Sequence, residues 1–220
     1  MSPRACPRCW SPDRAAVTNP VMWTAVSDLG DAALTLPLAV MCIVWLTLST
    51  AGRHLATSWA LMLAAGMALV GATKMLYAGC GIQIRAIDFR VISGHTMLAS
   101  AVWPMACVLA LGCGVQLRAR TSLLLGLGLG LALGALIGIA RVFDDAHTPS
   151  EVVIGWLVGS AVALAFVWRH GAPRVDARYR ALVAGSLLAV SAVAYGRHAP
   201  IQGAIEMYSP FLCGRFALQP

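Results

Sequence analysis

The sequence predicts an all-α protein, a polytopic bundle of about six transmembrane helices. Apolar residues make up 59% of the 220-residue chain and charged residues only 11%, and the mean hydropathy is +0.77. Soluble domains carry about 25% charged residues, so this composition excludes a soluble fold. The apolar residues also gather in runs long enough to cross about 30 Å of hydrocarbon as helices, which takes roughly 20 residues each.

Six such runs are expected to form the spans. They lie at residues 32–50, 57–78, 96–115, 121–140, 152–168 and 180–196. Arg180 and Arg197 bracket the last and shortest run, so five spans plus an interfacial helix is the alternative. Residues 1–30 are expected to form an extramembrane N-terminal segment, 31–197 the bundle and 198–220 a C-terminal tail. The first span is expected to be an uncleaved signal anchor, because the residues before it lack the positive-then-apolar order of a cleaved signal.

The cysteines suggest no metal centre. Cys6 and Cys9 form a C-x-x-C pair, typical of half a zinc site or of a redox pair. The sequence contains no second pair to complete a four-sulfur site, so neither role is favoured. The others lie in or near apolar runs, where cysteine behaves as a small apolar residue: Cys42, Cys80, Cys107, Cys113 and Cys213.

A glycine repeat marks the fourth run as a packing helix. Gly126, Gly130, Gly134 and Gly138 recur every four residues and so fall on one helical stripe. Small residues at this spacing let a second helix approach closely in lipid. A nucleotide-binding loop is not indicated, because the glycines lie inside an apolar run with no strand before them.

The arginines predict the orientation of the bundle. With six spans, one face carries Asp176 as its single acid against Arg53, Arg118, Arg120, Arg169, Arg174, Arg178 and Arg180. Such loops remain cytoplasmic, so the opposite face is expected in the periplasm of a bacterial inner membrane. An arginine-rich surface beside anionic lipid accounts for the net charge of +7, and no nucleic-acid partner is expected.

Cations gather at that opposite face. Lys74, the only lysine of the chain, lies about one turn before the second run ends. An ammonium near a membrane boundary snorkels to the interface or has a functional role. The following loop adds Arg85, Asp88 and Arg90, so up to three cations converge before residue 93. Such a cluster suits a dianion.

Ser93, Gly94 and His95 open the third run. Ser93 is a candidate N-cap, and a helix N-terminus combines unpaired N–H groups with a positive dipole end. Gly94 lets an anion approach the backbone. The segment therefore reads as a phosphate cradle, although a capped helix with an interfacial histidine has the same sequence.

A third motif, Arg141-x5-His147-x3-Glu151, favours the phosphate cradle over an ordinary capped helix. It places a phosphate-binding guanidinium, an imidazole and a carboxylate in one short loop. If Glu151 begins the fifth span, its carboxylate can accept from one ring nitrogen of His147 and leave the other free to attack.

Together, Lys74, Ser93-Gly94-His95 and Arg141-x5-His147-x3-Glu151 resemble the three motifs of the type 2 phosphatidic acid phosphatase superfamily, in its membrane lipid-phosphatase branch. The resemblance covers about residues 57–170. It implies a helical bundle and metal-independent hydrolysis of a phosphomonoester or pyrophosphate through a phosphohistidine, with no cofactor.

The resemblance also implies roles for individual residues. His147 matches the nucleophile, Glu151 its orienting partner and His95 the general acid. Phosphate binding is implied for Lys74, Arg141 and the Ser93-Gly94 region.

This chain departs from the family pattern at four places. Positions 81 and 82 are Gly and Ile where the family has Arg-Pro, so Arg85 or Arg90 substitutes or that contact is missing. Ile92 replaces a proline, Ala140 a serine and Glu151 an aspartate. These changes bear most on substrate choice and rate.

Two other functions fit the same residues. A metal-dependent hydrolase would use Asp88, Asp144, Asp145 and Glu151 as oxygen ligands for Mg²⁺ or Ca²⁺. A non-catalytic lipid-phosphate carrier would bind the headgroup without breaking a bond. For the phosphatase, the expected partners are a lipid phosphate substrate and membrane lipids. The sequence chooses neither the lipid nor the oligomeric state.

Overall fold

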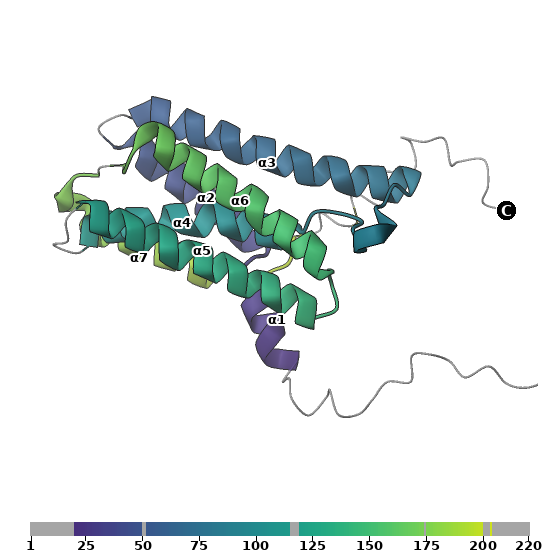
Figure 1. Cartoon of the computed structure of the whole chain (residues 1–220). Helices are drawn as coiled ribbons and strands as arrows, with labels where there is room; N and C mark the ends of the chain where they lie inside the picture. Colours follow the sequence, from purple (N-terminus) through teal and green to yellow (C-terminus); the bar gives the residue numbers. More distant parts are fainter. Residues whose placement is uncertain (1–19, 50–51, 115–118, 174, 200–202, 204–220) are drawn as a thin grey trace, which may run out of the picture.

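The computed structural model describes residues 20–49, 52–114, 119–173, 175–199 and 203. Within these ranges the chain forms helices and no strand, apart from an isolated bridge between Ile84 and Phe89. The α-helices are α1 (Pro20–Asp28), α2 (Ala32–Thr47), α3 (Gly52–Cys80), α4 (Gly94–Gly114), α5 (Ala119–Phe143), α6 (Pro149–His170) and α7 (Arg180–Ala194). Two short 3-10 helices, η2 (Arg85–Ile87) and η3 (Ala177–Tyr179), lie between them. Helices α2 to α7 run side by side, and α1 lies at an angle at one end (Figure 1).

The predicted transmembrane bundle is confirmed. In the part of the chain that the structure describes, five segments are long and apolar enough to cross a membrane: Val21–Thr47, Gly52–Cys80, Gly94–Gly112, Ala119–Phe143 and Pro149–His170. The first begins at Val21 rather than at residue 32, because α1 adds about two and a half turns before α2.

Helix α7 is the short sixth helix that the sequence suggested. Its 15 residues span about 22 Å at 1.5 Å per residue, less than the hydrocarbon thickness. It nevertheless runs the length of α2. At its middle, Ser186 accepts a hydrogen bond from the Trp45 indole at 2.9 Å, and just beyond its end the Tyr195 hydroxyl donates to the Ala25 carbonyl at 3.0 Å.

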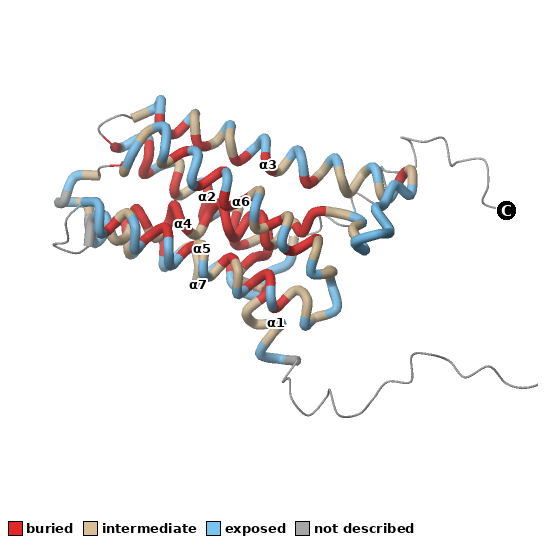
Figure 2. Tube along the Cα trace, in the orientation of Figure 1, coloured by how far each residue is buried: buried red, intermediate tan, exposed pale blue. Residues whose placement is uncertain are grey.

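Helix α4 is the centre of the bundle and packs against α2, α5, α6 and α7. The α5 glycine stripe lies against it, as predicted: a Cβ on Gly126 would lie 2.8 Å from Val108 Cα, and one on Gly130 would overlap the Pro104 backbone. On the other side, Gly155 and Gly159 of α6 meet α4 in the same way. Buried residues accordingly concentrate along α4, while the outer faces of the surrounding helices are exposed (Figure 2).

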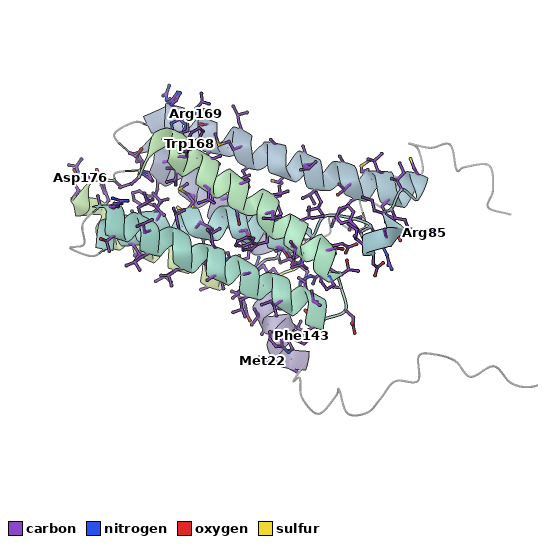
Figure 3. The ribbon with its side chains drawn as sticks, viewed as in Figure 1. Met22, Arg85, Phe143, Trp168, Arg169 and Asp176 are labelled. Carbon is purple, nitrogen blue, oxygen red and sulfur yellow. The ribbon has the colours of Figure 1, made fainter. Side chains whose placement is uncertain are left out.

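The outer surface of the bundle is apolar, as lipid contact requires. Exposed side chains on these faces include Val44, Leu61, Leu129, Leu157 and Leu188. Trp168, 91% exposed, lies with Arg169 and Asp176 at the end opposite Arg85 (Figure 3). A tryptophan and arginines at one end match the interfacial belt and positive loops of a membrane protein.

The cysteine interpretation needs one correction. Cys42 is buried and Cys107 half-buried, both with free thiols, as expected of small apolar residues. Cys80 is instead disulfide-bonded, because it ends α3 outside the apolar interior, where a thiol can meet a partner. Cys6 and Cys9 lie outside the described residues.

Candidate active site

One end of the bundle encloses a cavity of about 860 Å³. The end of α3, the start of α4, the end of α5 and the start of α6 meet there, together with the α1–α2 turn. The polar residues that line it include Asp31, Lys74, Tyr77, Arg90, His95, Arg141, Asp145, His147, Thr148 and Glu151. Residues from all three sequence motifs therefore line one cavity.

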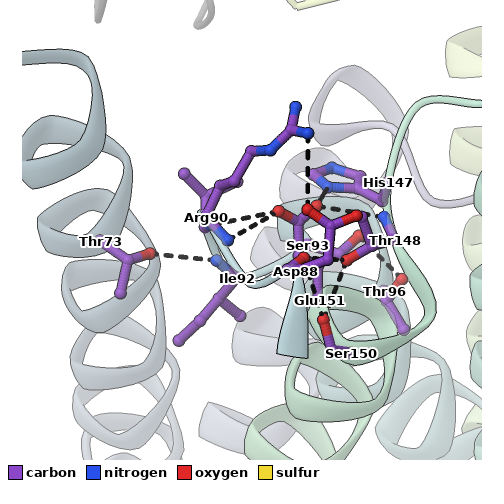
Figure 4. A network of polar contacts seen from close by, with 11 residues as sticks. Thr73, Asp88, Arg90, Ile92, Ser93, Thr96, His147, Thr148, Ser150 and Glu151 are labelled. Carbon is purple, nitrogen blue, oxygen red and sulfur yellow. Dashed lines mark hydrogen bonds and ion pairs between the residues drawn. The ribbon is translucent and has the colours of Figure 1, made fainter. Parts of the chain in front are cut away.

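His147 and Glu151 form the tightest polar contact of the site. The Nδ1 atom of His147 lies 2.6 Å from Glu151 Oε2 (Figure 4). The local sequence explains this geometry. Thr148 is the N-cap of α6, Pro149 begins the helix, and Glu151 is the third helical residue, whose carboxylate reaches back to the Thr148 N–H at 3.3 Å. A helix start thus holds the carboxylate beside the imidazole.

The second carboxylate oxygen of Glu151 holds a different segment. Its Oε1 accepts from the backbone N–H groups of Arg90 at 3.0 Å and Val91 at 3.2 Å (Figure 4). Glu151 is 3% exposed, and these bonds satisfy the buried carboxylate. The loop before α4 is further fixed by the Ile92 N–H, which donates to Thr73 Oγ1 at 3.2 Å.

His147 lies in the loop between α5 and α6, and burial lowers its pKa from the ordinary value of 6.5. The hydrogen bond to Glu151 and the carboxylate charge act in the opposite direction, but burial outweighs them. The ring is therefore neutral at pH 7. With Nδ1 engaged by the carboxylate, Nε2 carries the free lone pair.

Three cationic side chains line the cavity: Lys74, Arg90 and Arg141. Lys74 Nζ lies 3.8 Å from the point that a Cβ on Gly94 would occupy, so the ammonium lies beside the first residue of α4. Arg141 Nη1 donates to the Ser27 hydroxyl at 3.1 Å, and its Nε is buried without a hydrogen-bond partner among the described residues. Lys74 and Arg141 place positive charge on opposite helices of the cavity.

Gly94, the first residue of α4, lines the cavity, whereas Ser93 does not. Ser93 precedes α4 at the expected N-cap position and is fully buried. Its hydroxyl bonds to Thr96 Oγ1 at 2.9 Å and its N–H donates to the Glu151 carbonyl at 3.2 Å. The side chain is therefore engaged in the α4–α6 contact, and the contribution of this segment to the cavity comes from the first-turn backbone, whose N–H groups have no intrahelical acceptor.

The two arginines that could replace the missing first-motif arginine lie in different places in the structure. Arg90 lines the cavity, and its Nη2 lies 3.5 Å from Asp88 Oδ1. Arg85 lies in η2, points away from the bundle (Figure 3) and is not among the lining residues. The reason is the loop geometry: Ile84 and Phe89 pair with each other, which carries η2 outward.

Sequence reasoning missed two parts of the cavity. Asp31 lies in the α1–α2 turn, which is distant in sequence from all three motifs although it lines the same cavity. Met67, Val70 and Gly71 continue one stripe of α3 from Lys74 toward the bundle interior, and Met97 and Leu98 of α4 face the same cavity. The residues of this stripe recur in the sequence at spacings of three and four, but that spacing is common to every packed helix and does not indicate a cavity.

The carboxylates considered as metal ligands do not assemble. Among the described residues, no group of three or more His, Cys, Asp and Glu side chains is placed to hold a metal ion. Glu151, which lines the cavity, already accepts four hydrogen bonds.

The fold and site define an integral-membrane helical bundle with a cavity lined by three cationic side chains and a histidine–carboxylate pair. Residues 3–175 match the PAP2 superfamily, and the chain belongs to it. Members of this superfamily are phosphatases, which assigns this protein to the phosphoric ester hydrolases.

The chain is also similar to a curated protein of unassigned function. The chain is 34% identical over 146 residues to an "Uncharacterized 22.5 kDa protein in cps region" of Klebsiella pneumoniae, an alignment that covers 66% of this chain and 68% of the relative. No solved structure matches the chain significantly.

Proposed function

We propose that this protein hydrolyses a phosphate ester or pyrophosphate on a membrane lipid, through a phosphohistidine on His147 and without a metal ion. The observation that carries the proposal is the 2.6 Å contact between His147 Nδ1 and Glu151 inside a cavity lined by three cations. The substrate phosphate would lie among Lys74, Arg141 and the first turn of α4. Arg141 Nε, buried without a partner among the described residues, would gain one in a phosphate oxygen.

His147 is proposed as the nucleophile. Its Nε2 lone pair forms a bond to phosphorus while the bond from phosphorus to the leaving oxygen breaks. Glu151 fixes the tautomer and stabilises the positive charge that the ring gains. The cations stabilise charge on the equatorial phosphoryl oxygens, which is the main demand of phosphoryl transfer.

His95 is proposed as the general acid and base. It gives its proton to the leaving oxygen in the first step. It then takes a proton from water, whose oxygen bonds to phosphorus as the bond to His147 Nε2 breaks. The two steps release the lipid product and inorganic phosphate and restore both histidines.

The shape of the cavity favours a lipid substrate. From Lys74 to Met67 the lining stripe of α3 extends about 10 Å toward the bundle interior, at 1.5 Å per residue. Below the cations its walls are apolar, with Val70, Met97 and Leu98. A headgroup phosphate at the cations would therefore leave its chain beside side chains that a hydrocarbon can contact.

We place the cavity on the periplasmic side of a bacterial inner membrane. The arginine-rich loops at the opposite end favour a cytoplasmic location for that end. The disulfide of Cys80, at the same end as the cavity, favours an oxidising compartment.

The test is phosphate release by detergent-purified protein from phosphatidic acid, phosphatidylglycerol phosphate and undecaprenyl diphosphate, with and without EDTA. The wild type should be active and EDTA-resistant, and His147→Ala and His95→Ala should be inactive. His54→Ala, an exposed histidine at the far end, is the control and should retain activity. Loss of turnover in EDTA would instead support a metal-dependent hydrolase, and binding without turnover by the wild type would support a carrier.

A further inference from the structure

The α1–α2 turn brings a buried carboxylate to the second histidine of the site. Asp31 Oδ2 lies 3.4 Å from His95 Nε2, and the Asp31 side chain is 9% exposed. Gly30 makes this approach possible. A Cβ at Gly30 would lie 2.6 Å from Ile137 Cγ2 and 3.1 Å from the His95 carbonyl oxygen, so the turn is pressed against the start of α4.

We propose that Asp31 is a positioning residue for His95, so that each histidine of the site has its own carboxylate. The inference rests on the proposed function and assigns a role to a residue outside the three motifs. The negative charge of Asp31 beside Nε2 favours a proton on that nitrogen, so the proton that moves is the one on Nδ1. After His95 has donated that proton to the leaving oxygen, the same contact keeps Nε2 protonated and leaves Nδ1 as the acceptor for the proton of the attacking water.

Asp31 also supplies a negative charge beside His95. Before the reaction His95 must carry a positive charge in a cavity that already holds Lys74 and Arg141. An imidazolium among cations needs a counter-charge at short range, and Asp31 lies within ion-pair distance. Glu151 does not serve this purpose, because its oxygens are bonded to His147, Thr148 and the loop before α4.

Asp31 is itself held in place by two elements. Its Oδ1 accepts from the Ala33 N–H at 2.7 Å, which caps α2, and from the Ala199 N–H at 3.1 Å. His198 Nδ1 lies 3.4 Å from Oδ2. The segment after α7 thus closes over the carboxylate, and it lies beyond the residues matched to the superfamily.

Asp31→Asn tests this role, because it changes the charge of the side chain with little change in its shape. An asparagine keeps an oxygen for the Ala33 and Ala199 N–H groups and is an equally good N-cap. It removes the charge and the acceptor that face His95. Asp28→Asn is the control, because Asp28 is a neighbouring acid of the same turn whose carboxylate lies 4.0 Å from His198.

The readout is the dependence of the loss on the leaving group. Dioctanoyl phosphatidic acid releases an alkoxide and needs the proton of His95, whereas p-nitrophenyl phosphate releases a stable phenolate and does not. Asp31→Asn should lower kcat/KM, which reports the steps up to formation of the phosphohistidine, by about 10- to 100-fold on the first substrate and by less than about threefold on the second. His95→Ala should show the same selectivity, Asp28→Asn should resemble the wild type, and both asparagine variants should keep the wild-type melting temperature.

An equal loss of kcat/KM on both substrates would overturn the inference, because a general structural defect does not distinguish leaving groups. Full activity of Asp31→Asn on both would overturn it as well, while leaving the phosphatase proposal intact. Absence of turnover by the wild type on both substrates would overturn the proposed function itself.

Discussion

At the scale of single residues, Glu151 organises the site. One carboxylate orients His147, caps α6 and anchors the loop that precedes α4. The extra methylene of glutamate relative to the aspartate of the family pattern is used here, because its second oxygen reaches the Arg90 and Val91 N–H groups.

The pH profile of kcat/KM should report this pair. His147 attacks only when unprotonated, so activity is lost as the pH falls through its pKa. Burial lowers that pKa below the ordinary 6.5, so the wild-type acid limb should lie below pH 6.5. Glu151→Gln removes the contributions that raise the pKa, so its limb should move to still lower pH, while the maximal rate falls roughly 10²- to 10⁴-fold because the tautomer is no longer fixed. A shift of the limb to higher pH would contradict the assignment of His147, and Asp176→Asn at the far end is the control.

The two arginines of the η2 loop make a matched pair. Arg90→Ala should raise KM for a lipid phosphate by roughly 10-fold, the cost of one charge-assisted hydrogen bond. Arg85→Ala should change KM by less than about twofold, because Arg85 lies outside the cavity lining. Steady-state kinetics on both variants checks this, and an equal effect of the two would mean that the loop closes differently over substrate.

Some of these residues were accessible from the sequence and others were not. The His147–Glu151 contact was predictable, because the two lie four residues apart at a helix start with its own capping signals. The choice of Arg90 over Arg85 depends on how the Ile84–Phe89 bridge turns the loop. Asp31 reaches His95 only through tertiary packing at Gly30, which no local pattern encodes.

At the scale of elements, the contact between α4 and α5 determines how the catalytic ends meet. Helix α4 begins at Gly94, beside His95, and α5 carries Arg141 in its last turn, so any change in their spacing moves two functional groups relative to each other. Hydropathy predicted the bounds of the long helices to within a few residues. It did not predict α1, because the apolar residues of α1 follow a proline-rich segment and were assigned with it to the extramembrane N-terminus.

Gly126→Ala tests this contact. The new Cβ would lie 2.8 Å from Val108 Cα, which is backbone and cannot rotate away, so α4 and α5 must separate. We expect a loss of about 1–3 kcal/mol in stability, measured as a lower melting temperature in detergent, together with reduced activity.

Gly128→Ala is the control for that substitution. A Cβ at Gly128 meets nothing within 4 Å, so the variant should keep or slightly raise the melting temperature. Equal destabilisation by both alanines would show that the α4–α5 contact is looser than the structure has it.

At the scale of the whole molecule, the two ends of the bundle differ in kind. One end holds the cavity and the disulfide-bonded Cys80, and the other carries Arg53, Arg169 and Arg178 with exposed Trp168. This polarity predicts a fixed orientation in the membrane.

Reporter fusions check the orientation. Alkaline phosphatase, which is active only outside the cytoplasm, should be active when fused after Ala146 and inactive after Ala172, because these positions lie at opposite ends of the bundle. The reverse pattern would place the cavity in the cytoplasm, and it would then have to be reconciled with the arginine-rich loops.

The apolar stripe that continues from Lys74 to Met67 has a kinetic consequence. An enzyme that takes its substrate from within a bilayer or micelle responds to the mole fraction of that substrate in the surface, so added detergent should slow turnover at constant bulk concentration. For a non-hydrolysable alkyl phosphonate, each methylene that enters the stripe should add about 0.8 kcal/mol, about fourfold in potency, until the chain outgrows the wall at Met67.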